Sequence, residues 1–219
     1  MTTEAALRDE IVRIGASLYA RGLAHATAGN ISARLDDGWL VTPTDACLGT
    51  LDPARLSKVD VHGLHVSGER ASKTLSLHRA IYAADPGTRC VLHTHAAHLV
   101  ALTLAGVWRD DAIVPPVTPY VVMKVGRVPL IPYARPGAPE VAPLVQEAIV
   151  QARAEGRRLR AVMLDRLGPV AWHESPAAAM AVLEELEETA KVWLLSGRGA
   201  QPLDDAALEA LRVAFGAVW

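Results

Sequence analysis

The chain has 219 residues, 51% of them hydrophobic, and a formal net charge of -2 at pH 7. This length suits one domain or at most two small ones, and the apolar fraction is large enough for a sizeable core. The near-neutral charge without a basic stripe argues against nucleic-acid binding, and the lack of an apolar run of roughly 18 residues argues against a membrane span.

Helix and strand signals follow one another through the first half of the chain. Apolar residues at helical spacing predict a helix over 4–21, and Gly22 suits its end. Asp37-Gly38 is a strong turn signal between two short strands within 31–43. We further expect a β segment over 59–68, a helix over 74–84 capped by Ser72, a strand over 89–95 and a helix over 96–104.

The second half begins with a proline-rich stretch. Residues 114–133 combine prolines with many β-branched residues, which predicts short strands broken by turns. We then expect a helix over 138–154, two strands around a turn over 160–173, and helices over 176–196 and 203–214. We find no internal repeat and no interdomain linker, so residues 1–219 are expected to form one α/β domain with a largely antiparallel or mixed sheet.

The cysteines and the N-terminus predict a cytoplasmic protein. Cys47 and Cys90 are the only cysteines, too few for a disulfide framework, and we interpret both as small buried hydrophobic residues. The first 15 residues are charged and amphipathic, without the apolar core of a signal peptide.

The segment VLHTHAAH, 91–98, holds three of the eight histidines. His93 and His95 are two residues apart on a predicted strand, so both imidazoles face the same side. Such a pair can provide half of a tetrahedral or octahedral metal site, and the alternative is a pair of surface histidines at a strand end. His98 falls in the first turn of the next helix, where it either joins the metal ligands or caps and packs locally.

Five ordered motifs resemble the class II aldolase/adducin family: TAGNIS (27–32), TPTDACLG (42–49), SKTLSLHRAIY (72–82), VLHTH (91–95) and GPVA (168–171). The similarity covers nearly the whole chain. Three further stretches resemble the branch of 3-oxo-tetronate 4-phosphate decarboxylases in particular: LDPARLSKVD, VTPYVVMKVGRVPLIPYARPG and LEELEETAK.

The resemblance implies a fold, an assembly and a reaction class. The fold is a single-domain, three-layer class II aldolase-like one, with a central, mainly antiparallel sheet and helices on both faces. The assembly is a homotetramer with sites at the subunit interfaces. The reaction is carbon–carbon bond cleavage, by decarboxylation or aldol cleavage, of a small hydroxylated and acidic or sugar-derived substrate. A divalent metal, zinc first and manganese or cobalt as alternatives, would stabilise the enolate.

The resemblance also assigns roles to individual residues. Two histidines, His93 and His95, would bind the metal. The small-residue loops would hold a substrate phosphate through backbone and hydroxyl donors. Lys73 would meet a carboxylate or phosphate, and Tyr120 would act as a proton donor in the site of a neighbouring subunit. The matching loop residues are Asn30, Ser32, Thr44 and Ser72.

Four positions depart from the family pattern. Leu167 stands where a third metal-binding histidine is usual, and Thr74 stands where a glutamate lies four residues before His78. Arg166 replaces an asparagine, and Asp45 replaces the glycine of the phosphate loop. Leucine cannot bind a metal, a hydroxyl is a poor ligand or base, and a carboxylate repels phosphate.

The missing third ligand leaves several replacements open. His98 follows the pair in sequence, and His25 and Asp45 belong to loops that border the site in this fold. His173 should lie at the far end of the next strand and is a weak candidate. Asp45 and Arg166 could instead form a new catalytic set, a general base and an oxyanion-stabilising group, or an ion pair.

Three hypotheses therefore remain for the function. The first is a metal-dependent carbon–carbon lyase, and the second is altered, metal-independent chemistry on the same scaffold, as a lyase, isomerase or cyclase. The third is a non-catalytic binding or assembly protein, for which adducin is the family precedent. The sequence does not identify the substrate.

Overall fold

The computed structural model describes residues 3–219 and contains one eight-stranded sheet with the strand order β4-β3-β2-β1-β5-β8-β7-β6. All neighbouring strands pair antiparallel except β6 and β7, which are parallel. The strands are β1 (Asn30–Arg34), β2 (Gly38–Val41), β3 (Ser57–Asp60), β4 (His65–Ser67), β5 (Cys90–His93), β6 (Leu130–Ile131), β7 (Ala161–Leu164) and β8 (Gly168–His173).

In the part of the chain that the structure describes, seven α-helices connect and cover these strands. They are α1 (Glu4–Ala20), α2 (Leu75–Ala84), α3 (Ala97–Ala105), α4 (Pro119–Lys124), α5 (Val141–Ala154), α6 (Pro176–Leu195) and α7 (Asp205–Phe215), and two 3₁₀ turns cover Leu48–Thr50 and Pro53–Arg55. Within residues 3–219, no helix is both long and apolar enough to cross a membrane.

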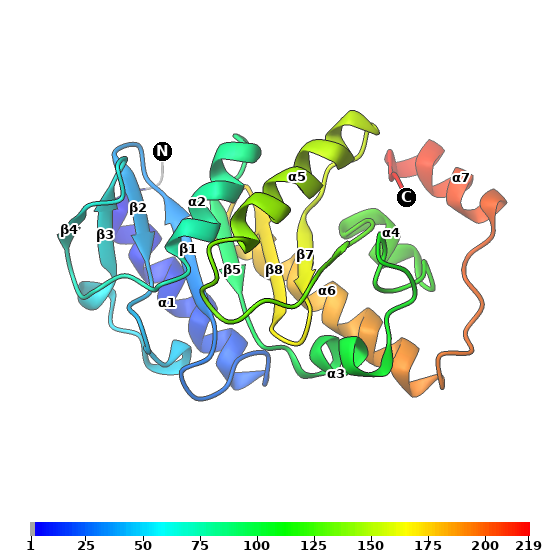
Figure 1. The fold of residues 1–219 in the computed structure, drawn as a ribbon, viewed down its shortest axis with the longest axis horizontal. Helices are drawn as coiled ribbons and strands as arrows, with labels where there is room; N and C mark the ends of the chain where they lie inside the picture. The colour runs from blue at the N-terminus through cyan, green and yellow to red at the C-terminus, as the bar shows by residue number, and fades with distance from the viewer. Residues whose placement is uncertain (1–2) are drawn as a thin grey trace.

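The sheet separates two hydrophobic cores. One face packs against α1, α3, α4 and α6, and the other packs against α2 and α5 (Figure 1). Strand β5 shows the alternation that this requires, because Val91 belongs to the α2/α5 core and Leu92 to the opposite one. The predicted fold, a mainly antiparallel sheet with helices on both faces, is confirmed.

The stretch 114–133 differs from its prediction as short strands. Residues Pro119–Lys124 form helix α4, and only Leu130–Ile131 is a strand. The helix begins where Thr118 accepts a hydrogen bond from the Val121 N–H and where Pro119 occupies the first helical turn, which proline favours. These local start signals prevail over the β propensity of the valines that follow.

The start of α2 also differs in detail. Ser72 does not cap the helix, because its hydroxyl contacts the Thr74 hydroxyl at 2.9 Å and the first helical residue is Leu75. The segment around Ser72 is instead tied to the loop after β2. The Thr44 N–H donates to the Arg70 carbonyl and the Ser72 N–H to the Thr42 carbonyl. These bonds bring the two small-residue loops together beside β1.

Candidate active site

A cavity of about 320 Å³ lies on the α2/α5 side of the sheet. Its wall comes from the loops before β1, after β2, before α2 and before α5, and from the end of β5 and the β7–β8 turn. The lining residues are Thr27, Ala28, Gly29, Asn30, Pro43, Thr44, Asp45, Ser72, Lys73, Thr74, Ser76, Leu77, His93, His95, Arg135, Pro136, Gly137, Ala138, Val141, Ala142, Leu164 and Leu167.

His93 is held at the cavity by the neighbouring strand. Its Nδ1–H donates to the Pro169 carbonyl at 2.9 Å, and because that carbonyl can only accept, the bond leaves Nε2 with a free lone pair. Burial, and then the nearby His95, lower the pKa of His93 to about 4. The ring is therefore neutral near pH 7, as a metal ligand or proton acceptor must be.

His95 and His25 continue this cluster. The ring centroids of His93 and His95 are 5.1 Å apart, and those of His95 and His25 are 6.0 Å apart. Burial, and then His25, lower the pKa of His95. Three imidazoles thus lie next to one another, with His25 exposed at the edge.

His93 and His95 can provide two ligands of a divalent metal site, and no third ligand is in position within the described residues. Leu167 lines the cavity at the position of the missing histidine and offers no lone pair. Thr74 lines it too, but its hydroxyl contacts Ser72. Within residues 3–219, no three histidine, cysteine, aspartate or glutamate side chains are arranged to hold a metal ion. His25 is the neighbouring imidazole that would have to move to complete the set.

His98, a candidate third ligand, is not brought to the cavity. Its Nδ1 lies 2.8 Å from Oε1 of Glu187 on α6, and Glu187 also accepts hydrogen bonds from the backbone N–H groups of His98 and Leu99. Glu187 thereby satisfies the start of α3, and His98 packs there, as the alternative interpretation expected. His173 is likewise absent from the cavity wall.

Ser32 does not reach the cavity either. It is fully buried, and its hydroxyl lies 2.8 Å from His78 Nδ1 and 2.9 Å from the Tyr82 hydroxyl. Burial, and then His93, lower the pKa of His78 to about 3. Ser32 and His78 thus form a neutral polar network beneath the site, which corrects the expected contact between Ser32 and substrate.

Asn30 remains in the cavity wall. It pairs with His93 across the β1–β5 ladder and is 6% exposed. Its side-chain oxygen is buried without a hydrogen-bond partner. This oxygen is therefore an unsatisfied acceptor beneath the surface of the cavity wall.

Asp45 and Arg166 share a backbone conformation but not a location. Their φ angles are 58° and 63°, in the left-handed region that glycine and asparagine favour, which explains the residues usual at these positions. Asp45 lines the cavity, whereas the Arg166 side chain is 61% exposed and lies outside the wall. Within the described chain, Asp45 and Arg166 form no ion pair with each other. The Nε atom of Arg166 instead lies 3.9 Å from Oδ2 of Asp165.

Of the remaining predicted site residues, some line the cavity and one does not. Thr44, Ser72 and Lys73 line the cavity. Tyr120 does not: it sits on α4, is 56% exposed, and has the Lys124 ammonium over its ring. Tyr120 therefore has no place in the cavity of its own subunit.

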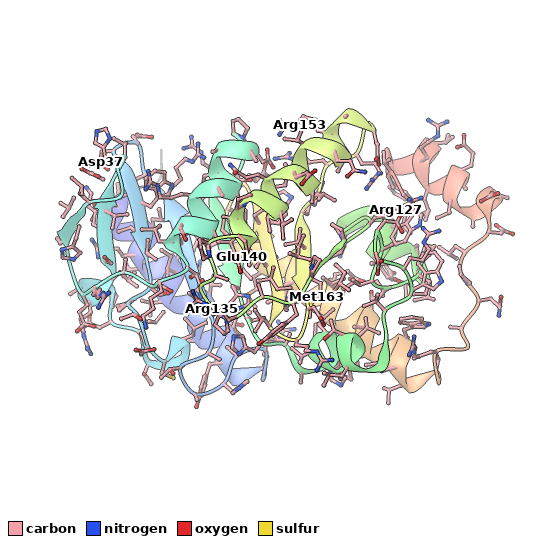
Figure 2. All side chains as sticks on the ribbon, in the orientation of Figure 1. Asp37, Arg127, Arg135, Glu140, Arg153 and Met163 are labelled. Carbon is pink, nitrogen blue, oxygen red and sulfur yellow. The ribbon has the colours of Figure 1, made fainter. Side chains whose placement is uncertain are left out.

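Arg135, a cation in the cavity wall, was not among the site residues that the sequence predicted. Figure 2 shows it on the loop between β6 and α5, on the face of the sheet where α2 and α5 lie. The available signal was the turn sequence Arg-Pro-Gly, which fixes the loop backbone at that point. The charged side chains of the wall are Lys73, Arg135 and Asp45, a balance that favours an anionic ligand.

Comparisons with known proteins agree with this architecture. The 3-oxo-tetronate 4-phosphate decarboxylase of Cupriavidus necator is 57% identical, covering 100% of both chains. The crystal structure of YgbL from Klebsiella pneumoniae, a candidate aldolase, epimerase or decarboxylase, has a TM-score of 0.87 at 40% identity, covering 97% of this chain and 100% of that one. The L-fuculose phosphate aldolase of Escherichia coli is 29% identical, covering 79% of this chain and 75% of its own.

A family model described as the class II aldolase and adducin N-terminal domain matches residues 9–194. This range includes all eight strands of the described sheet, helices α2 to α5 in full and most of α1 and α6. It also includes every cavity-lining residue. The chain therefore belongs to the class II aldolase and adducin family.

Proposed function

We propose that this protein is a carbon–carbon lyase that decarboxylates a small, hydroxylated, sugar-derived acid in the cavity beside His93 and His95. The observation that carries the proposal is the 57% identity, over all of both chains, to the 3-oxo-tetronate 4-phosphate decarboxylase of Cupriavidus necator. The relatives confirm the enzyme class, and they favour it over a non-catalytic binding protein. The substrate we propose is a 3-oxo acid of four carbons that carries a phosphate.

The chemistry of such a substrate defines what the cavity must do. The bond between the carboxylate and the neighbouring carbon breaks, CO₂ leaves, and the electron pair passes to the carbonyl oxygen as an enolate. A proton must then be delivered to carbon. The site must therefore stabilise a developing oxyanion and supply a proton.

His93 and His95 are the residues that would hold a divalent ion, with zinc first and manganese or cobalt as alternatives. Both rings are neutral near pH 7, and the Pro169 carbonyl orients His93. When bound, the ion would polarise the carbonyl oxygen. We propose His25 as the third protein ligand, because its ring lies beside that of His95.

The remaining residues would bind and orient the substrate. Lys73 would attract an anionic group, while Thr44 and Ser72 offer hydroxyl donors in the same wall. Asp45 would accept a proton or a hydroxyl hydrogen bond. Tyr120 would deliver the proton from a neighbouring subunit of a homotetramer, since it cannot act in the cavity of its own chain.

Leu167 and Thr74 favour a second candidate, in which the same scaffold cleaves or isomerises a related substrate without a metal. Both residues line the cavity at positions where the family pattern has a ligand or an acid/base group. In that case Asp45 would serve as the general base, and Lys73 would stabilise the oxyanion.

The deciding experiment measures metal content and turnover in the same preparation. Protein purified without chelator or a histidine tag is assayed by mass spectrometry for metals and with 3-oxo-tetronate 4-phosphate for CO₂ release. We expect about one divalent ion per chain, lost with activity in His93→Ala and retained in the matched variant His62→Ala, which changes an exposed histidine outside the cavity.

Two other outcomes separate the alternatives. CO₂ release that persists after complete removal of metal would establish the metal-independent lyase. No CO₂ release from this substrate or from its unphosphorylated form, with or without added zinc, manganese or cobalt, would refute the proposed decarboxylase.

A further inference from the structure

The charged side chains of the cavity have no partners within the protein. Lys73, Arg135 and Asp45 all line it and are exposed, and in residues 3–219 none of the three side chains forms a hydrogen bond or an ion pair with another protein group. Two cations and one carboxylate are therefore free to interact with a ligand. The two cations create a local attraction for an anion that the protein itself does not satisfy.

Arg135 combines a fixed backbone with a free guanidinium. The Ala138 N–H donates to the Arg135 carbonyl at 3.0 Å, Pro136 follows Arg135, and Gly137 has a φ of 76°. This is the pattern of a type II turn with proline and glycine at its two central positions. Ala138 and Val141 then bury themselves in the α2/α5 core. The turn thus anchors Arg135 at the cavity without using its five N–H donors.

Asp45 determines where an anion can lie. It occupies the loop after β2, where a glycine would leave backbone N–H groups open to a phosphate, and its carboxylate repels such a group. The Asp45 carboxylate suits a hydroxyl group of a ligand, and Arg135 suits its anionic group.

We infer that Arg135 is the main anion-binding residue of this cavity, with Lys73 as a second cation, and that Asp45 binds a hydroxyl group. The ligand class is a short polyhydroxy compound with an anionic terminus, either a phosphate monoester or a carboxylate. A guanidinium binds either group through two parallel hydrogen bonds. The inference rests on the proposed function in one respect. The anionic group that Arg135 binds is at the end of the substrate opposite the carboxylate that leaves as CO₂.

The test measures binding directly and needs no turnover. Inorganic phosphate and threonate, a four-carbon sugar acid without phosphate, are titrated calorimetrically at low ionic strength into wild type, Arg135→Gln and Arg135→Lys. Arg13→Gln is the matched control, because Arg13 is an exposed arginine of α1 outside the cavity.

We expect Arg135→Gln to weaken the binding of at least one probe by about tenfold or more, the loss that corresponds to one charge-assisted hydrogen-bond pair. Arg135→Lys should recover part of that affinity, and Arg13→Gln should bind like wild type. Loss confined to phosphate assigns a phosphate monoester, and loss confined to threonate assigns a carboxylate. Equal affinity of Arg135→Gln and wild type for both probes overturns the inference.

Asp45→Asn provides an independent arm, since asparagine tolerates the same positive φ. Removing the carboxylate should tighten phosphate binding severalfold, and unchanged affinity contradicts the role given to Asp45. Failure of the proposed decarboxylation leaves these results intact, because neither probe reacts. Conversely, normal decarboxylation with unaltered binding in Arg135→Gln sinks the inference alone.

Discussion

At the scale of single residues, Leu167 is the replacement with the clearest chemical consequence. It lines the cavity with His93 and His95 and packs against the α2/α5 core. A branched hydrocarbon there removes a lone pair and adds an apolar surface. The two neutral imidazoles are left as half of a site.

The variant Leu167→His should therefore bind zinc more tightly than wild type, by about tenfold or more, because it returns a third imidazole to a preformed pair. Competition with a zinc chelator measures the affinity. Leu167→Gln is the control for a polar residue of similar length, and it should not gain affinity. Equal affinity of the two variants would mean that position 167 does not face the metal-binding pair.

The sequence predicted that the His93 and His95 imidazoles lie together, and their ring centroids are 5.1 Å apart. The predicted strand over 89–95 was too long, because β5 ends at His93 and His95 lies in the segment before α3. The sequence left His98 open between a metal ligand and local packing, and it could not show the packing partner, because Glu187 lies 89 residues away in the chain. It missed Arg135, because the direction of a turn side chain depends on the packing of the whole loop.

At the scale of elements, the β7–β8 turn and β5 act together. The Pro169 carbonyl accepts from the His93 ring and from the Thr94 N–H. Gly168 precedes it with a φ of 114°, and a Cβ added there would overlap the Thr94 carbonyl oxygen. The turn thus has to approach β5 with no side chain between them.

Gly168→Ala should lower the free energy of unfolding by about 3 kcal/mol or more, because strained backbone and a steric overlap add. Gly197→Ala is the control: Gly197 also has a positive φ, but a Cβ there would meet nothing within 4 Å. Urea unfolding of both variants measures the difference. A Gly168→Ala protein as stable as Gly197→Ala would contradict the close approach.

The buried histidines beneath and beside the cavity should make stability depend on pH. His78 and His93 have pKa values lowered to about 3 and about 4, whereas an unfolded histidine titrates near 6.5. Between pH 6.5 and 4 the unfolded chain therefore binds more protons than the folded one. The free energy of unfolding should fall with falling pH by about 1.4 kcal/mol per unit for each histidine.

His78→Gln should reduce this slope by about 1.4 kcal/mol per pH unit in metal-free buffer, and His62→Gln, an exposed control, should leave it unchanged. Urea titrations between pH 7 and pH 4.5 measure it. The slope of the free energy of unfolding against pH is compared between the variants and wild type, because the substitution itself also changes the free energy of unfolding at every pH. An identical slope in His78→Gln and wild type would show that His78 is not kept neutral by burial.

Regular elements were predictable where periodicity and end signals agreed. The helices α1, α5 and α6 and the strands on both sides of the 160–173 turn have nearly their expected bounds. Helix α4 was not predicted, because six residues are too few to show a helical period. There, the Thr118-Pro119 start signal was the only local indication.

At the scale of the whole molecule, Tyr120 raises the question of how subunits assemble. It is exposed on α4, away from the cavity of its own chain. The proposed homotetramer would give it a site to reach, with Tyr120 and His93 of one site coming from different subunits. The sequence could suggest this assembly only through the family resemblance, since no pattern within one chain specifies a subunit contact.

Mixing two inactive variants tests this arrangement. Tyr120→Phe and His93→Ala should each lose most activity as pure proteins, whereas subunits exchanged between them should regain about a quarter of the wild-type rate, because some sites then contain both intact residues. Light scattering should show a tetramer for each variant. A monomer, or no recovery after verified exchange, would contradict a shared site.

The residues that line the cavity come from two kinds of structure, a central strand and loops. His93 sits on a central strand held on both edges by hydrogen-bonded neighbours. Lys73, Asp45 and Arg135 sit on loops outside the strands and helices. Loops accept substitution more readily than central strands do. Mutations in the loops can therefore change the residues that determine substrate specificity, while His93 keeps its place on the central strand. Descendants of this chain can acquire new substrates by changes in three short loops.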